Sequence, residues 1–104
     1  MGKTWKISKK TSFKIACRTR EGEKTEDRTG YIVTVAGMKG VKLMVHRDKD
    51  RWTLSEYRTG LMAVNNGKTR EGIINRGLSA MDIRGITADK IKTECWPIYP
   101  VVNE

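Results

Sequence analysis

The spacing of apolar residues changes once along the chain, and this change limits the possible folds more than any other feature. In the first half, apolar residues recur at every second position. The runs that show this alternation are 5–8, 13–18, 31–36, 41–46 and 52–55. A period of two is typical of strands that turn one face to a core and the other to water. This part of the chain is therefore predicted to form a sheet.

The links between these runs predict antiparallel hairpins. Gly37–Gly40 is a short, glycine-bounded link, and Asp48–Asp50 suits a tight turn because Asp readily bonds its own backbone. Arg58–Gly60 and Asn65–Gly67 are predicted turns on either side of one more short strand at 61–64. The second of these turns also suits a residue with positive φ.

After residue 69, apolar residues take the spacing of a helix. The residues at i, i+3, i+4 and i+7 are Ile74, Gly77, Leu78 and Met81. This spacing predicts an amphipathic helix with one face toward a core. Thr69 is the predicted N-cap, and Gly85 is the predicted stop.

The C-terminal part is predicted to hold a short second helix and an extended tail. Thr87 can cap a helix that cannot pass Trp96, because Pro97 disfavours helical backbone in the residue before it. The segment Cys95–Val102 is interpreted as extended chain packed across the domain. Together these patterns predict one α+β domain over residues 1–104, an antiparallel sheet of about five strands with one main amphipathic helix on one face.

The same patterns predict which side chains form the core. Its expected members are Val33, Val35, Leu43, Val45, Trp52, Leu54, Ile74, Leu78 and Met81. Trp5, Phe13 and Tyr31 also fit the core side of their strands. Tyr57 falls on the face opposite Trp52, where it either stacks on a base or a partner side chain or simply ends an exposed strand.

The chain carries 21 Lys and Arg against 12 Asp and Glu, for a net charge of +9, and this charge is unevenly distributed. The first twenty residues hold seven cations and no acid. Four acids lie in the polar stretch Arg20–Gly30, which has no apolar face and is predicted to be a mobile loop. A positive field attracts polyanions, either nucleic acid or an acidic protein surface. The alternative is that these cations solubilise exposed strand faces and blunt sheet edges.

Two groups of residues are candidates for a binding surface, and the sequence does not choose between them. The N-terminal group consists of Lys3, Lys6, Lys9, Lys10 and Lys14. The second group consists of Arg47, Lys49, Arg51 and Arg58, with Tyr57 as a stacking surface. If the hairpin pairs as expected, the second group forms a stripe along one strand. A stripe suits a phosphate backbone or an elongated acidic groove better than a single anion.

No pattern for catalysis, a cofactor or a metal is found. His46 is the only histidine and has no second ligand at metal spacing. Cys17 and Cys95 form no C-x-x-C pair, so neither a disulfide framework nor a zinc site is expected. Gly67-Lys68-Thr69 opens a helix as a phosphate loop does, but the glycine required five residues earlier is Met62. We therefore expect a non-enzymatic protein without cofactors.

The apolar runs are only a few residues long, and no apolar stretch follows the basic N-terminus. We therefore expect neither a membrane-spanning helix nor a secretory signal. Widely spaced cysteines fit a reducing compartment. The expected location is the cytoplasm, with no membrane partner.

The chain resembles small phage and prophage accessory proteins in the segment Arg51–Leu61 and in Gly67–Glu71 together with the amphipathic helix that follows. The shared pattern is a strand with Trp, a Thr-Gly turn, a short strand, and Gly-Lys-Thr-Arg-Glu opening a helix, and it covers roughly a third of the chain. The helix departs from it, because Gly72, Asn75 and Gly77 stand where alanine is usual. No functional residue is carried over from the resemblance.

This resemblance implies a mobile-element origin in a bacterial host. Small proteins of this kind include inhibitors of host defence, such as anti-CRISPR proteins. The expected function is inhibition or modulation of a host nucleic-acid machine, through an anionic or nucleic-acid-facing surface of a host protein or ribonucleoprotein complex. The alternative is a module whose basic strands bind nucleic acid directly.

Overall fold

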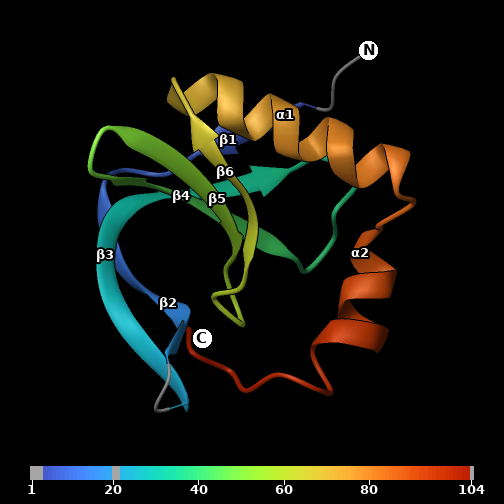
Figure 1. Ribbon diagram of the computed structural model, residues 1–104. Helices are drawn as coiled ribbons and strands as arrows, with labels where there is room; N and C mark the ends of the chain where they lie inside the picture. Colours follow the sequence, from blue (N-terminus) through green and yellow to red (C-terminus); the bar gives the residue numbers. More distant parts are fainter. Residues whose placement is uncertain (1–3, 20–21, 104) are drawn as a thin grey trace.

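The computed structural model describes residues 4–19 and 22–103, and in this part the chain forms one curled antiparallel sheet followed by helices (Figure 1). The six strands are β1 (Trp5–Ile7), β2 (Thr11–Thr19), β3 (Gly22–Val35), β4 (Lys42–Asp48), β5 (Arg51–Glu56) and β6 (Met62–Gly67). The helices are α1 (Arg70–Ile83) and α2 (Ala88–Lys90), which continues into a π-helical turn at Ile91–Cys95. The predicted α+β architecture is confirmed, with one strand more than the expected five.

The long strand β3 gives the sheet its curl (Figure 1). The strand order is β1-β3-β4-β5-β6, and β2 pairs with β3 next to β1. β2 therefore pairs with the first part of β3, from Gly22 to Gly30, and β1 pairs with its last part, from Val33 to Val35. Because β4 pairs with β3 only from Gly30 onward, the β2–β3 hairpin is free to bend away from the rest of the sheet.

The segment Arg20–Gly30 was predicted to be a mobile loop, and for its described part, Gly22–Gly30, this prediction is wrong. These residues are the first part of β3 and pair with β2. The register sets Lys14 opposite Asp27, and Nζ of Lys14 lies 3.1 Å from Oδ1 of Asp27. Cross-strand pairs of opposite charge stabilise a strand whose side chains face water. Such a strand needs no apolar alternation, so the pattern used to find strands does not detect it.

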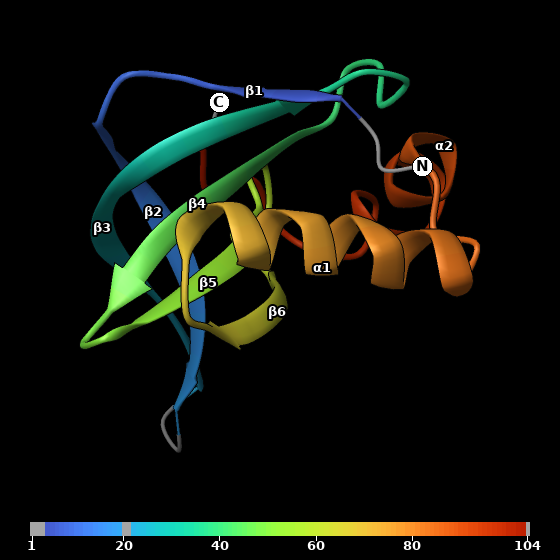
Figure 2. The ribbon, with the colours of Figure 1, turned by 90° about the horizontal axis from the view of Figure 1, so that it is seen from above.

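The sheet carries an apolar cluster on each face. The larger cluster lies between the sheet and α1, which crosses β4, β5 and β6 (Figure 2). Eight of the nine predicted core residues are buried in it, and the ninth, Trp52, is half-buried at its edge. Phe13 is buried, but in the smaller cluster on the opposite face, with Ile15 and Met44. The curled β2–β3 hairpin thus covers β4 on its second side.

The predicted helix caps are confirmed. The Thr69 hydroxyl accepts a hydrogen bond from the Gly72 N–H at 3.0 Å, and the Thr87 hydroxyl accepts one from the Lys90 N–H at 3.2 Å. Such caps satisfy backbone donors that have no partner within the helix. Among the described helices, none is long and apolar enough to cross a membrane.

Two predictions about irregular segments need correction. Asn65–Gly67 was predicted to be a turn but belongs to β6, whose pairing with β5 is interrupted by a bulge. The bulge uses the positive φ expected there, with Asn66 at 63°. The tail was predicted to be extended from Cys95, but the π-helical turn is followed by a turn and a bend, and the extended chain begins at Pro100. The capped helix runs on because the first proline that disfavours it is Pro97.

At Gly77, α1 packs tightly against Leu54 and Val64 of the sheet, and this contact predicts the effect of a larger side chain. A Cβ at position 77 would overlap Cδ2 of Leu54 and lie 3.1 Å from Cγ2 of Val64. Overpacking of a buried contact costs about 1–3 kcal/mol, more than the gain of about 0.5–1 kcal/mol in helix propensity. We expect Gly77→Ala to lower the free energy of unfolding in urea denaturation. Ser79→Ala, at an exposed position of the same helix, is the control, and equal stability of the two variants would contradict this packing.

Candidate functional site

A buried carboxylate organises the turn between β5 and β6. Glu56 is 6% exposed and accepts hydrogen bonds from the backbone N–H groups of Arg58 at 2.6 Å and Thr59 at 3.2 Å. It also accepts from the Thr59 hydroxyl at 2.8 Å and from Nε1–H of Trp96 at 3.1 Å. The same side chain therefore shapes the Thr-Gly turn and holds the C-terminal helical segment against the sheet.

The C-terminal tail joins β2 to this turn. Oδ1 of Asn103 accepts from the Lys14 N–H at 2.8 Å, and its Nδ2 donates to the carbonyl oxygens of Lys14 at 2.7 Å and Tyr57 at 2.8 Å. Beside it, the Ala16 N–H donates to the Gly60 carbonyl at 3.0 Å. Gly60 has a φ of 71°, and a Cβ there would lie 2.7 Å from the Ala16 nitrogen. The curled sheet is thus closed along one side.

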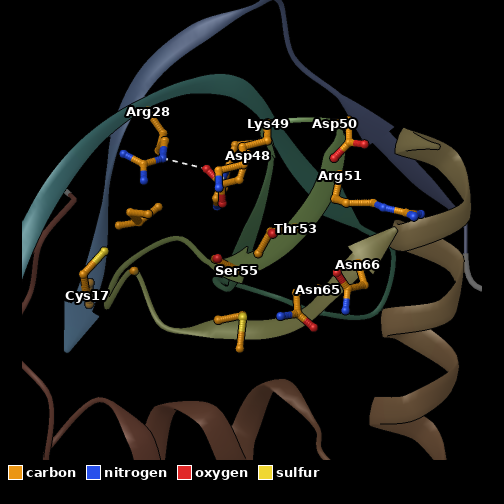
Figure 3. Close-up of a pocket in the computed structure, with 15 residues that line it drawn as sticks. Cys17, Arg28, Asp48, Lys49, Asp50, Arg51, Thr53, Ser55, Asn65 and Asn66 are labelled. Atoms are coloured by element: carbon orange, nitrogen blue, oxygen red, sulfur yellow. Dashed lines mark hydrogen bonds and ion pairs between the residues drawn. The ribbon is translucent and has the colours of Figure 1, made fainter. Parts of the chain in front are cut away.

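The space inside this curl is a pocket of about 410 Å³ (Figure 3). Thr53 and Ser55 of β5 lie at its centre in the view, with Asn65 and Asn66 of β6 on one side. Residues from β2, β3 and the β4–β5 turn complete the lining, among them Cys17, Arg28 and Lys49. The pocket therefore combines polar side chains from five strands that are distant in the sequence.

His46 lines this pocket and is buried without a hydrogen bond. Its side chain is 1% exposed, and neither ring nitrogen has a hydrogen-bond partner among the described residues. Nδ1 lies 3.4 Å from Oδ2 of Asp48, which is longer than the usual N–H···O hydrogen bond. Burial lowers the pKa of His46, and the carboxylate of Asp48 opposes this only in part. The ring is therefore neutral near pH 7.

Arg28 is held by its own neighbours. Its Nε donates to Oδ1 of Asp48 at 2.8 Å, and a terminal nitrogen lies 2.8 Å from a carboxylate oxygen of Glu26. The other terminal nitrogen donates to the Asp27 carbonyl at 3.0 Å. The hydrogen bond to Asp48 is the main cause that raises the pKa of Arg28. The charges of Arg28 and Asp48 thus largely cancel inside the pocket.

The geometry does not favour a reactive thiol in the pocket. Burial raises the pKa of Cys17, and the nearby carboxylate of Glu26 raises it further. The thiol is therefore protonated at neutral pH, whereas a nucleophilic cysteine requires the thiolate. Cys17 and Cys95 are both free thiols. Within the described ranges, no three His, Cys, Asp or Glu side chains converge as metal ligands would.

The described members of the N-terminal group of predicted binding residues are all exposed. Lys3 lies outside the described residues. Lys6 is exposed on β1, and Lys9 and Lys10 are exposed in the link that follows it. None of these three pairs with an acid in the part of the chain that the structure describes. Lys14 is also exposed, but it forms the ion pair with Asp27 described above.

The second group is divided among three places and does not form the expected stripe. Arg47 pairs with Trp52 and so shares the face of the sheet that bears α1. Lys49 and Arg51 lie at the rim of the pocket (Figure 3). Tyr57 and Arg58 follow the far end of β5 and line a separate small depression. Because side chains alternate between the two faces of a strand, one strand cannot present all of these charges together.

Tyr57 and Arg58 are engaged within the molecule. The Tyr57 ring is half-buried beside the smaller apolar cluster, with Nζ of Lys42 at 5.8 Å from its centroid. The Arg58 guanidinium lies over the Trp96 ring, 4.6 Å from its centroid. These contacts stabilise the C-terminal segment and reduce the ring surface that is open to a ligand.

The pocket could not be recognised as a site from the sequence, and its residues include His46, Thr53, Ser55, Asn65 and Asn66. They share no motif, and they converge only because the sheet curls. One usable signal was the side-chain alternation, which sets His46 and Thr53 on the same face of paired strands. Another was the positive φ expected at Asn66.

Comparisons of the chain with protein-family models, curated proteins and solved structures return no match.

The buried imidazole predicts a pH-dependent stability. Because the folded pKa of His46 is lowered, the unfolded state binds the proton more tightly, and stability falls as the pH drops below about 6.5. We expect urea midpoints of the parent protein to decrease between about pH 7 and pH 5.5. His46→Gln should remove most of this dependence, since the chain has one histidine. An equal decrease in the variant would assign the effect to other groups.

The Glu56 network predicts a sensitivity to an uncharged replacement. Glu56→Gln keeps the shape of the side chain but replaces one carboxylate oxygen by an amide NH2 group. This group faces the Arg58 N–H or the Thr59 hydroxyl, so a buried donor loses its acceptor. The expected loss in free energy of unfolding is about 2–4 kcal/mol by chemical denaturation. Glu94→Gln, at an exposed position of the π-helical turn, is the control. If the two variants were equally stable, Glu56 would not be the residue that holds this turn.

Proposed function

We propose that this protein is a non-enzymatic inhibitor or modulator of a host nucleic-acid machine, of the anti-CRISPR kind and of phage origin, acting in the bacterial cytoplasm. Its contact surface is the basic link between β1 and β2. The observation that supports this is the exposure of Lys6, Lys9 and Lys10, which have no acidic partner in the described part of the chain. Cations without an acidic partner attract a phosphate backbone. They equally attract an acidic protein groove that presents similar negative charge.

The aromatic residues support contacts to charge rather than to stacked bases. All seven aromatic side chains are buried or half-buried. Arg70 covers the Tyr31 ring at 4.7 Å, and Lys42 and Arg58 lie over Tyr57 and Trp96. Proteins that bind single strands without sequence preference normally present exposed rings on which bases stack. The outer surface therefore suits a phosphate backbone or protein carboxylates.

The second candidate function is direct binding of nucleic acid, and the cross-strand register favours it. Lys6 on β1 pairs with Thr34 on β3, which pairs with Lys42 on β4. Two cations therefore lie in one row across three strands, about 10 Å apart at the usual strand spacing. A row of cations on a sheet provides salt-dependent contacts to a backbone.

Charge reversal tests the proposed surface. The test variant combines Lys6→Glu, Lys9→Glu and Lys10→Glu. The control, with the same net change at exposed positions elsewhere, combines Lys39→Glu, Lys68→Glu and Lys90→Glu. Because exposed lysines contribute little to stability, both variants should fold. We expect only the test variant to lose the ability to restore plating of a targeted phage on a bacterium with an active CRISPR system.

A binding assay separates the two candidate functions. An inhibitor that binds a protein surface should leave free duplex DNA and single-stranded RNA unshifted at physiological salt. A direct nucleic-acid binder should shift them, with a log–log salt slope that falls by about 3 in the test variant. If test and control variants match the parent in both assays, the β1–β2 link is not the contact surface.

A further inference from the structure

The pocket inside the curled sheet is distinct from the surface just proposed. None of the lysines of the β1–β2 link lines it. Its volume of about 410 Å³ lies within the range of small-molecule sites, and its lining comes from strands and the turns that join them. A ligand here would be recognised by groups that play no part in the contact to a polyanion.

His46 indicates what chemistry the pocket can recognise. A neutral imidazole has one donor and one acceptor, yet in this buried position neither ring nitrogen forms a hydrogen bond with a described residue, and Nδ1 has only the 3.4 Å contact with Asp48. Buried polar groups normally have hydrogen-bond partners, so each exception calls for an explanation. The hydroxyl groups of Thr53 and Ser55 and the amide of Asn65 lie around the same space (Figure 3). The interior therefore offers neutral donors and acceptors to a neutral polar group.

The rim of the pocket carries the positive charge. Lys49 and Arg51 are exposed and have no acidic partner among the described residues, whereas Arg28 is paired with Asp48 and Glu26. The exposed carboxylate of Asp50 lies at the rim as well and offsets one of these two cations. In Figure 3, Lys49 lies above Asp48, while Arg51 extends toward α1. An anionic group would thus be placed at the opening and not in the interior.

An apolar wall stands beside these polar groups. Ile15 is buried, and Met62 is 59% exposed although it lines the pocket. A flexible thioether makes favourable contacts with an aromatic ring. The wall therefore provides a surface for a flat, weakly polar group.

The backbone is also unusual at this pocket. Among the described residues, only Lys49 and Asn66 have positive φ without being glycine, at 57° and 63°. Both line the pocket. Such conformations are costly, particularly for lysine, and they often occur where a site is shaped.

We propose that this pocket binds one nucleotide, with its base among His46, Ser55 and Met62 and its phosphate at Lys49. A nucleotide combines the three features that the pocket separates: a flat ring face, neutral hydrogen-bonding edges and an anion at one end. The ligand is either a free mononucleotide or a single unpaired nucleotide of a strand, which share this chemistry. This inference goes beyond the proposed function, because a different surface carries it.

Titration of the protein with AMP, CMP, GMP and UMP tests the pocket, with amide chemical shifts as the readout. For at least one of them we expect a dissociation constant between about 10 µM and 1 mM, the range for a small polar ligand. The largest shifts should fall on β5 and β6, around Ser55 and Asn66. Ribose 5-phosphate and inorganic phosphate serve as probes that lack the base, and each should bind at least about tenfold more weakly.

Two pairs of variants test the assigned roles. Lys49→Gln should weaken nucleotide binding about five- to tenfold, whereas Lys39→Gln, in the turn between β3 and β4, should leave it unchanged. Met62→Ala should weaken binding of nucleotides but not of phosphate. Ile83→Ala, at an apolar residue that is 85% exposed on α1, is its control. All four positions are exposed, so the variants are expected to fold.

Several results would overturn the inference. They are no saturable binding up to about 10 mM of any nucleotide, equal binding of ribose 5-phosphate, or shifts that fall outside the pocket. A preference for a short single strand over mononucleotides identifies the strand as the source and supports the inference. The reversal of Lys6, Lys9 and Lys10 should leave mononucleotide binding intact. Failure of the pocket and failure of the β1–β2 surface are therefore distinguishable.

Discussion

The arrangement of the whole molecule depends on how the C-terminal tail holds the two ends of the curled sheet together. Asn103 uses its side-chain amide as a strand would use its backbone, bonding both the N–H and the carbonyl of Lys14. A third hydrogen bond reaches the Tyr57 carbonyl, and Glu56 fixes the same turn from inside. Because these bonds join segments that are far apart in the sequence, they form only when the sheet has curled.

This closure divides the molecule into surfaces with different physical character. The larger apolar cluster under α1 supplies most of the buried surface, and with it the main driving force for folding. The outer face of β1 and β2 carries exposed cations. Because these cations contribute little to stability, their side chains can be substituted to suit a partner without loss of the fold. The inner face of β4 and β5 combines the smaller apolar cluster around Met44 with polar pocket residues such as His46, Thr53 and Ser55.

The sequence was sufficient to predict the regular parts of the fold, because burial on one face leaves a periodic pattern. The alternation at Leu43 and Val45 and the helical spacing at Leu78 located β4 and α1 correctly. The first part of β3 was missed because its side chains face water, and cross-strand charge pairs such as Lys14–Asp27 leave no such period. The pocket was missed because its lining comes from five strands, and the contacts that close the curl join distant segments, such as Asn103 and Lys14, which are 89 positions apart.

The energetics of the two proposed surfaces differ in a way that links them to stability. Exposed cations remain hydrated in the free protein. A partner that binds them therefore gains electrostatic attraction but relieves no cost of burial. His46 is different, because each buried polar group without a partner costs about 1–3 kcal/mol. A ligand that pairs with the imidazole recovers part of this cost and binds only the folded state. Like any partner that binds only the folded protein, it stabilises the domain by RT ln(1 + c/Kd), where c is its free concentration. What distinguishes the pocket from the outer lysines is that its ligand also relieves the cost of the buried imidazole.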